Sequence, residues 1–364
     1  MRRTIALFYL FCSGLFPALA QVEFPVNGIQ NPVATSYAFR NVTLHISPDI
    51  RLENATLLIK DGKVIDSGTN ITVPDDAIQV SLKGRHIYPG FIELWSSYGI
   101  PEGEKIPAKP NQFSRPSPGA FAWNMAIHPE TDASSLFRKN ENEADRMRRC
   151  GFTTVLSHKQ DGIARGTGVL VSLAQKAENE CMLRPGLGTF FSLKKGSSPQ
   201  AYPSSQMGSI ALLRQAFYDA EAYGANQAGK PVNLSLEALL GNKKNQAFFE
   251  ADNWVEVLRG KQIGDEFGIS FIYKSGGDDY QRLDELKQAG IKLILPLEYP
   301  EAWDLSDSYS ESRIPLSALL HWEAAPANAE LVRRAGIPFV LSLHKLNTEA
   351  KMKEAIQKTI QAGL

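Results

Sequence analysis

Short runs of alternating apolar and polar residues occupy the first part of the chain, up to about residue 88. Four of these runs are typical of short strands: residues 39–45, 54–60, 63–68 and 78–82. Asp61 and Gly62 separate the second run from the third, and Asp-Gly between two apolar runs is a strong hairpin signal. We therefore predict a small antiparallel β domain over residues 37–88.

Helical and strand patterns alternate after about residue 132. Helical spacing covers residues 133–150, 209–223, 253–267, 280–289, 327–335 and 348–362. Short apolar runs typical of buried strands cover residues 153–157, 169–173, 189–193, 246–250, 269–273, 291–295 and 337–342. Helices of this length between short buried strands indicate parallel βα units.

The length and order of these elements favour an α/β fold with a TIM-like (β/α)8 barrel over residues 89–364, which we expect to be incomplete. Residues 100–130 are rich in Pro, Gly and Ser and predict a long loop within this region. A doubly wound open sheet is the alternative, but the sequence contains no Gly-rich phosphate-binding fingerprint that would support it.

The N-terminus has the features of an export signal. A basic start precedes an apolar run over residues 5–16, which is too short to span a bilayer. A small-residue pattern ends at Ala20 and predicts cleavage before Gln21. We expect residues 1–20 to be a signal peptide and residues 21–36 a linker, with the mature protein periplasmic or secreted and without a membrane span. A buried N-terminal helix or an uncleaved anchor is the alternative.

Charge and cysteine content narrow the class of protein. The chain has 39 basic and 39 acidic residues, so its charge does not point to nucleic acid or to an anionic membrane surface. Outside the predicted signal peptide, the cysteines are Cys150 and Cys181. An oxidising compartment permits a disulfide between them, although two separate buried thiols are favoured.

The start of the predicted barrel carries the most specific motif. Residues 89–93 are Pro-Gly-Phe-Ile-Glu, and Trp95 and Ser97 follow. This segment resembles the first barrel strand of the amidohydrolase superfamily, in which histidines at the two latter places hold a catalytic metal. Residues 111–119 and 165–173 resemble segments of imidazolonepropionase-like amidohydrolases exported by Bacteroidetes-type bacteria. In those long proteins a degenerate half precedes an intact one, and this chain is similar to the degenerate half.

The resemblance also implies where other metal ligands would lie. The matching positions hold Glu250 on the fifth strand, Ser275 on the sixth and His344 on the eighth. An indole N–H offers no lone pair to a metal, and a serine hydroxyl is a poor ligand. Because a catalytic zinc site needs about three protein ligands, we expect no metal and no other cofactor in this segment. Zinc would be required only if an atypical site were active.

Several residues are candidates for a functional site. Glu93, Glu250 and His344 are weak candidates for catalysis, since barrel chemistry occurs at the carboxyl ends of the strands. The structural alternatives are a hydrogen-bond acceptor role for Glu93 and a hydrogen-bonded loop histidine for His344. A second set of residues is predicted to line a substrate pocket: Trp95, Ser97, Tyr273 and Ser275.

The resemblance implies an exported amidohydrolase-like protein. This segment would be a metal-ligand-deficient barrel that supports a C-terminal catalytic half, or an equivalent partner, which hydrolyses non-peptide C–N bonds in cyclic amides. We expect the chain to be a fragment of a longer protein, because family members close the β domain with strands that follow the barrel. One alternative is an active metal-dependent amidohydrolase with an atypical site. The other is a periplasmic barrel that binds a small molecule between aromatic surfaces.

Overall fold

The computed structural model describes residues 36–102, 107, 112–115, 119–225, 231–304, 309, 312–346 and 348–364. The predicted signal peptide, with its cleavage position at Ala20 and Gln21, lies outside these residues, as does most of the predicted linker and part of the predicted 100–130 loop. Within the described part of the chain, every helix is too short or too polar to cross a bilayer. The chain divides into two compact units between Pro89 and Gly90.

The first unit is a small sheet of five strands in the order β3-β2-β1-β4, with β5 also paired to β1. Its strands are β1 (Ser36–Ser47), β2 (Ile50–Lys60), β3 (Lys63–Gly68), β4 (Ile78–Ser81) and β5 (His86–Ile87). The predicted hairpin between β2 and β3 is confirmed, because these strands pair antiparallel. Its turn residues Asp61 and Gly62 have φ values of 52° and 73°, a left-handed conformation that Asp and Gly tolerate.

The prediction of an all-antiparallel sheet is wrong for the end of this unit. Strands β4 and β5 pair parallel to β1, each against a different part of its length. After β3 the chain does not turn back in a tight hairpin. The longer connection over residues 69–77 carries it across to the free edge of β1, and a parallel pairing requires such a crossover.

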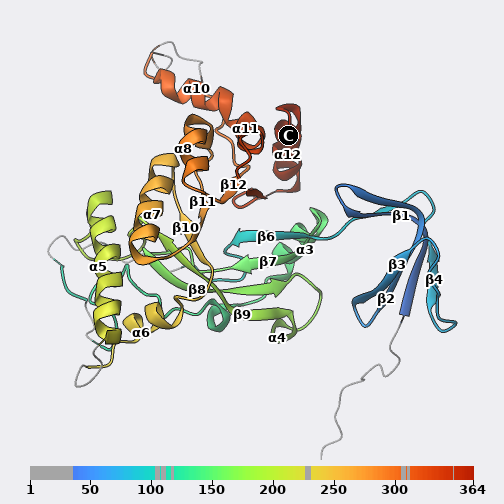
Figure 1. Cartoon of the computed structure of the whole chain (residues 1–364), viewed down its shortest axis with the longest axis horizontal. Helices are drawn as coiled ribbons and strands as arrows, with labels where there is room; N and C mark the ends of the chain where they lie inside the picture. Colours follow the sequence, from blue (N-terminus) through green and yellow to red (C-terminus); the bar gives the residue numbers. More distant parts are fainter. Residues whose placement is uncertain are drawn as a thin grey trace, which may run out of the picture. The chain divides into compact units, whose positions relative to one another are not determined.

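The second unit contains one sheet of eight strands in the order β13-β12-β11-β10-β9-β8-β7-β6 (Figure 1). The strands are β6 (Phe91–Ser96), β7 (Phe152–Ser157), β8 (Ala164–Ser172), β9 (Met182–Ser192), β10 (Ala247–Glu250), β11 (Phe271–Lys274), β12 (Leu293–Pro296) and β13 (Phe339–Ser342). Pairing is parallel between β6 and β7 and from β9 through to β13. These strands agree with the predicted βα pattern.

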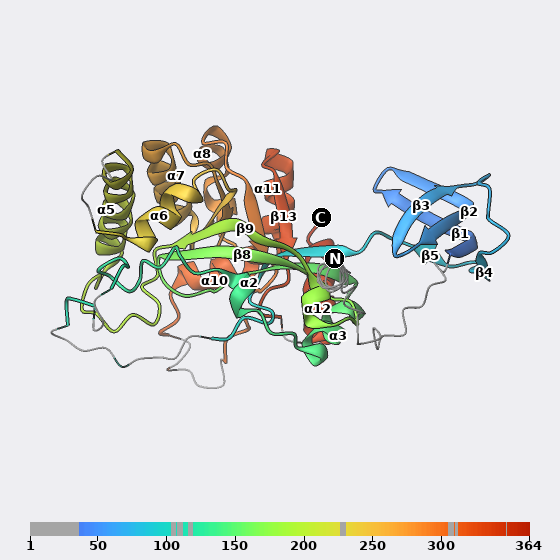
Figure 2. The same cartoon turned by 90° about the horizontal axis from the view of Figure 1, so that it is seen from below.

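The expectation of parallel βα units throughout is wrong in the middle of the sheet. Strand β8 is antiparallel to both β7 and β9, and Figure 2 shows β8 and β9 as two long neighbouring ribbons. Only residues 158–163 connect β7 to β8, which is too short for a helical crossover. The helix between β8 and β9, α4 (Glu178–Cys181), has a single turn. The sheet therefore differs from an ideal (β/α)8 barrel at this point.

Most helices of this unit cover the outer face of the sheet, whereas α10 has no buried residue. The helices are α2 (Ala133–Leu136), α3 (Glu141–Arg149), α5 (Gln206–Ala225), α6 (Leu234–Gly241), α7 (Trp254–Phe267), α8 (Leu283–Gln288), α10 (Leu316–Ala324), α11 (Asn328–Ala335) and α12 (Glu349–Gln361), with 3-10 turns η1 (Asp279–Arg282) and η2 (Ala325–Ala327). Helices α6 and α10 were not predicted. The predicted helix over residues 133–150 is interrupted, because Asn140 caps α3 by accepting a hydrogen bond from the Glu143 amide.

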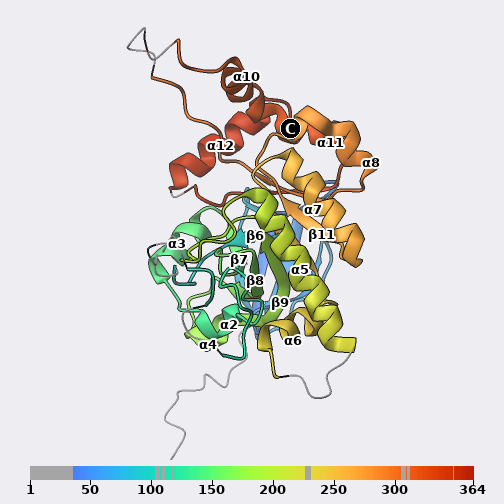
Figure 3. The same cartoon turned by 90° about the vertical axis from the view of Figure 1, so that its left-hand side faces the viewer.

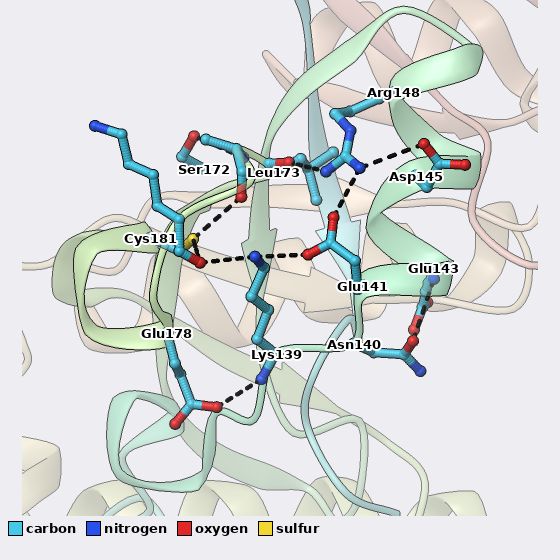
Figure 4. Close-up of polar contacts among 12 residues, drawn as sticks. Lys139, Asn140, Glu141, Glu143, Asp145, Arg148, Ser172, Leu173, Glu178 and Cys181 are labelled. Carbon is cyan, nitrogen blue, oxygen red and sulfur yellow. Dashed lines mark hydrogen bonds and ion pairs between the residues drawn. The ribbon is translucent and has the colours of Figure 1, made fainter.

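A polar network fixes α3 against the turn that follows β8 (Figure 4). Glu141 accepts from Arg148 at 2.8 Å and from Lys139 at 2.6 Å. Lys139 also donates to the Lys176 carbonyl, and its amide donates to Glu178. These bonds join α3 to the β8–α4 connection. Cys150 and Cys181 are both free thiols, so the favoured prediction of two separate thiols agrees with the structure.

The apolar side chains of the sheet form an inner and an outer layer. The inner cluster contains Trp95, Leu156, Phe190, Phe248 and Ile294, which come from five different strands. The outer residues of β9–β12 pack under α5, α6, α7, α8 and α11, and those of β7 and β8 pack with α2, α3 and α12. Figures 1 and 3 show the helices arranged around the sheet in this way. The sheet is thus curled around an interior, as in a TIM-like barrel.

The barrel is not closed by backbone pairing. Strands β6 and β13 lie at the two ends of the strand order, and within the described residues they share no ladder. The side chain of Glu93 on β6 spans this seam. It accepts hydrogen bonds from the Ser342 hydroxyl at 2.8 Å and from the Leu343 amide at 2.9 Å.

Candidate functional site

Polar and charged side chains gather where the parallel strands end. Because β8 runs backward, its first residues lie at the same edge of the sheet as the last residues of its neighbours. We call the following set the mouth cluster: Trp95, His158, Arg165, Lys194, Glu250, Lys274 and His344. It combines four strand ends with the loops that follow them, and it sits above the inner aromatic layer.

Glu250 at the end of β10 is the anionic centre of the mouth cluster. One carboxylate oxygen lies 2.7 Å from Arg165 Nη2, and the other lies 3.0 Å from Lys194 Nζ. The Arg165 side chain is 1% exposed and that of Glu250 11% exposed, so this ion pair is largely withdrawn from water. Lys194 also contacts Asp252 at 2.7 Å nearer the surface. Both oxygens of Glu250 are therefore already bound to cationic groups.

The charges around Glu250 control its ionisation. Burial raises the pKa of Glu250, but the positive charges of Arg165 and Lys194 lower it by more, so the pKa lies well below its usual value. Glu250 is consequently ionised at neutral pH. It acts as a counter-ion for buried cations and is poorly suited to serve as a general base or acid.

Lys274 on β11 lies beside Glu250 on the neighbouring strand β10, since the two residues are partners in the strand register. The Lys274 side chain is buried, yet within the described residues its ammonium makes neither a hydrogen bond nor an ion pair within 4 Å. Burial lowers the pKa of Lys274, and the nearby Glu250 charge opposes that effect. Burial, together with the charges of Lys274 and Lys345, lowers the pKa of His344 to about 4. His344 is therefore neutral at pH 7.

An aromatic stack lies beneath the charges. The His158 ring stacks on Phe190 with centroids 3.7 Å apart, and Phe190 stacks on Phe248. Trp95 approaches His158 edge-on at 4.4 Å. Trp95 and His158 are both 0% exposed. In the part of the chain that the structure describes, neither the Trp95 Nε1 nor either His158 ring nitrogen has a hydrogen-bond partner.

Glu93 has a structural environment. Its carboxylate accepts from the Ser342 hydroxyl, the Leu343 amide and the Trp95 amide, the last at 2.9 Å. Burial raises the pKa of Glu93, and these donors oppose the rise. This arrangement agrees with the structural alternative for Glu93, a hydrogen-bond acceptor, although its partners lie on β6 itself and at the end of β13, and not on the adjacent strand β7.

A pocket of about 390 Å³ lies beside the seam between β6 and β13. It brings together four of the predicted site residues, Glu93, Trp95, Ser97 and His344, with walls from α3 and α12. Glu93 and Trp95 are almost fully buried behind its surface, so Ser97 and His344 are the more accessible of the four.

The other predicted site residues lie elsewhere. The Tyr273 ring packs in the outer layer against Phe249 and Phe271, on the helix-covered face of the sheet. Ser275 donates to Asp279 at 2.8 Å in a buried network. Glu250 belongs to the mouth cluster and does not line the seam pocket. The structure therefore separates Tyr273 and Ser275 from the pocket predicted to contain them.

The residues at the mouth do not fit a divalent metal centre. No three His, Cys, Asp or Glu side chains lie together as a metal would require, within the residues that the structure describes. The carboxylate that could serve as a ligand, Glu250, is bound by Arg165 and Lys194. A divalent cation here would have to displace those two groups or meet their repulsion.

Sequence reasoning missed the cationic half of the site. Arg165, Lys194 and Lys274 were not predicted as site residues. A signal was present for two of them, because Lys274 ends a strand and Arg165 interrupts a run of small and apolar residues. That Arg165 and Lys274 lie at the same edge of the sheet can be deduced only when the antiparallel direction of β8 is known.

Comparison with known proteins identifies the fold. No protein-family model matches the chain, and no curated protein sequence matches it. An amidohydrolase from Thermotoga maritima MSB8 has a similar structure, with a TM-score of 0.68 and 19% identity, over 90% of this chain and 84% of that one. This likeness confirms the predicted resemblance at the level of the fold.

Two further solved structures show looser likenesses. Another amidohydrolase is 16% identical over 90% of this chain and 83% of that one, with a TM-score of 0.46. An ochratoxinase from A. niger is 10% identical over 90% of this chain and 82% of that one, with a TM-score of 0.43. Both are too distant to inform the chemistry of the mouth.

Proposed function

We propose that this chain is an exported amidohydrolase-like barrel that has no metal centre of its own and supports a catalytic amidohydrolase half. That half, or an equivalent partner, would hydrolyse non-peptide C–N bonds in cyclic amides. The fold shared with an amidohydrolase supports the scaffold of this proposal. Export is inferred from the first 20 residues of the sequence.

One observation carries the proposal: at the mouth of the barrel, Arg165 and Lys194 hold both oxygens of Glu250. The positive charge that a catalytic barrel would take from a bound metal is here supplied by side chains. A guanidinium has no lone pair and no dissociable water, so it cannot generate a hydroxide nucleophile as a metal can. The ion pair stabilises the scaffold without offering that chemistry.

The competing hypothesis is an active metal-dependent enzyme that uses Glu93, Glu250 and His344. It requires Glu93 to leave its three hydrogen-bond donors and Glu250 to leave its two cations. Metal content measured by mass spectrometry, after dialysis against zinc, separates the hypotheses. We expect zinc well below one equivalent in the wild type and no difference in Glu250→Gln. One equivalent of zinc that is lost in Glu250→Gln, together with amide hydrolysis, would refute the proposal.

The supporting role is tested on the native protein. We expect the protein isolated from its source to co-purify with, or to be covalently continuous with, a hydrolase module that binds zinc. The isolated chain should show no amide hydrolysis. Hydrolysis by the isolated chain, or a native protein that has neither a partner nor an additional module, would contradict the support role.

A second candidate function is a small-molecule-binding barrel, and the seam pocket favours it. Its volume of about 390 Å³ lies in the range of small-ligand sites. Ser97 and His344 offer polar groups there beside apolar walls from Met147, Phe152 and Met352. Thermal shifts on adding small solutes, without turnover, would support this function. A Ser97→Ala variant should reduce the shift if the solute binds in this pocket.

A further inference from the structure

The mouth cluster carries more positive than negative charge, even when Asp252, which pairs with Lys194, is counted with it. Arg165, Lys194 and Lys274 face the two carboxylates Glu250 and Asp252. The Lys194–Asp252 contact is partly exposed, whereas Arg165, Glu250 and Lys274 are buried. The buried part of the cluster therefore has two cations for one anion. An uncompensated buried charge is costly, and a bound anion would relieve that cost.

Two residues of the mouth cluster also carry unsatisfied donors. Arg165 Nη1 and Trp95 Nε1 are buried and have no partner among the described residues. Both belong to side chains that are at least 98% buried, and both groups can only donate hydrogen bonds. The Lys274 ammonium has no hydrogen-bond or ion-pair partner in the described part of the chain either, but it still reaches accessible surface and so adds charge and not a buried unsatisfied donor. Buried polar groups are nearly always hydrogen-bonded, so the two unmatched donors, in a cluster with this ammonium, point to an acceptor ligand.

The two histidines of the cluster complete this environment. Burial, with the charge of Arg165, lowers the pKa of His158 well below its usual value, and His344 is also neutral at pH 7. A neutral imidazole can donate to an oxygen from one ring nitrogen, and it adds no further charge. Trp95 and His344 also belong to the wall of the seam pocket. A ligand with its charged group at the cluster could therefore place its body in that pocket.

From these contacts we propose that the mouth of the barrel binds the oxyanion group, a carboxylate or a phosphate, of a small solute. Lys274 and Arg165 would supply charge-assisted hydrogen bonds, and the Trp95 indole would supply a neutral one. This inference deepens the second candidate function and rests on the proposed absence of a metal centre. A metal at Glu250 would instead require these cations to move.

The test measures binding of inorganic phosphate and of acetate to the full chain by isothermal titration calorimetry at constant ionic strength. We expect at least one of the two anions to bind, and the one that binds identifies the class of ligand. Lys274→Met should weaken binding by about tenfold or more, because it removes a charge-assisted hydrogen bond. Lys274→Arg should retain most of the affinity. Lys261→Gln, which removes a surface cation on α7, should leave it unchanged.

A second variant keeps the proposal testable if Lys274→Met does not fold. Trp95→Phe keeps an aromatic ring and removes the indole N–H, so binding should weaken by roughly twofold to tenfold. Absence of binding for both anions, or binding that neither Lys274→Met nor Trp95→Phe weakens, overturns the proposal. Zinc content is measured on the same preparation. Zinc in the wild type would therefore refute the metal-free scaffold separately from the anion site.

Discussion

Replacement of His158 by Phe is predicted to stabilise the protein. The His158 ring lies between Trp95 and Phe190, fully buried, and neither nitrogen has a partner within the described residues. A phenyl ring would keep the stacking geometry and remove both unsatisfied nitrogens. Each buried polar group without a partner costs about 1–3 kcal/mol, so the two nitrogens together cost about 2–6 kcal/mol, while the additional ring carbon of Phe in a packed core costs about 1–3 kcal/mol. We expect a net gain of about 1 kcal/mol or more at pH 7.

The pH dependence provides the sharper part of this prediction. The pKa of His158 is lowered well below 6.5, so the unfolded chain binds a proton that the folded protein does not. The contribution of His158 to the free energy of unfolding is therefore fully present above pH 6.5 and is lost as the pH falls below 6.5. This loss is about 1.4 kcal/mol per pH unit, or about 2 kcal/mol between pH 7 and pH 5. His158→Phe has no titrating group at this position. The difference in free energy of unfolding between the variant and the wild type should therefore increase by about 2 kcal/mol from pH 7 to pH 5.

Urea denaturation followed by circular dichroism at pH 7 and pH 5 gives both quantities. His128 and His344, whose pKa values are lowered to about 4, are present in both proteins, and their contributions cancel in the comparison. Phe248→Leu is a matched control, since it disturbs the same stack without removing a titratable group. Its loss of stability should be the same at both pH values. An advantage of His158→Phe that does not grow between pH 7 and pH 5 would refute the argument.

Two further predictions concern the charged groups. Glu93→Ala should lower the free energy of unfolding by about 3 kcal/mol or more, because the Ser342 hydroxyl and two amides lose their acceptor, and Glu93→Gln should lose less. Amide hydrogen exchange should then speed up at Leu343, and a loss below about 1 kcal/mol would contradict the bridging role of Glu93. Arg165→Met should cost about 3 kcal/mol by removing the buried partner of Glu250 and leaving it only the partly exposed Lys194, and adding Glu250→Met should recover most of that stability. Urea denaturation of the single and double variants measures both values, and a double variant no more stable than Arg165→Met would count against the buried ion pair.

The predicted elements that proved correct rest on local signals. The β2–β3 hairpin follows from Asp61-Gly62, and the helix over residues 253–267 agrees with α7 because Asn253 caps it and Gly268 ends it in a left-handed conformation. The direction of β8 is not a local property. It depends on the length of the 158–163 connection and on pairing with β9, which forms far along the chain. Sequence periodicity identifies a strand without giving its direction.

The candidate site likewise contains residues that local sequence signals located and residues that depend on long-range strand pairing. The motif at residues 89–97 located Glu93, Trp95 and Ser97 at the end of a strand, and the structure confirms that position. Tyr273 was assigned to the pocket side, but Lys274 is the residue in register with Glu250, and neighbouring strand residues face opposite sides. An offset of one position therefore decides which of the two faces the barrel interior. The partner of Glu250 could not be predicted without the reversed strand that carries Arg165.

The seam between β6 and β13 has a consequence for how the protein misfolds. The edge of a strand that has no ladder partner can pair with an extended segment of another molecule, particularly when its side chains are apolar. Phe91 and Ile92 on β6 and Val340 on β13 are all more than 40% exposed. Within the described residues, the side-chain hydrogen bonds that join the two strands are those of the Glu93 carboxylate, at the carboxyl end of β13. If β6 and β13 separate transiently, two unpaired strand edges become exposed at once. Aggregation on storage should therefore begin with intermolecular pairing of these two edges, while the helices remain folded.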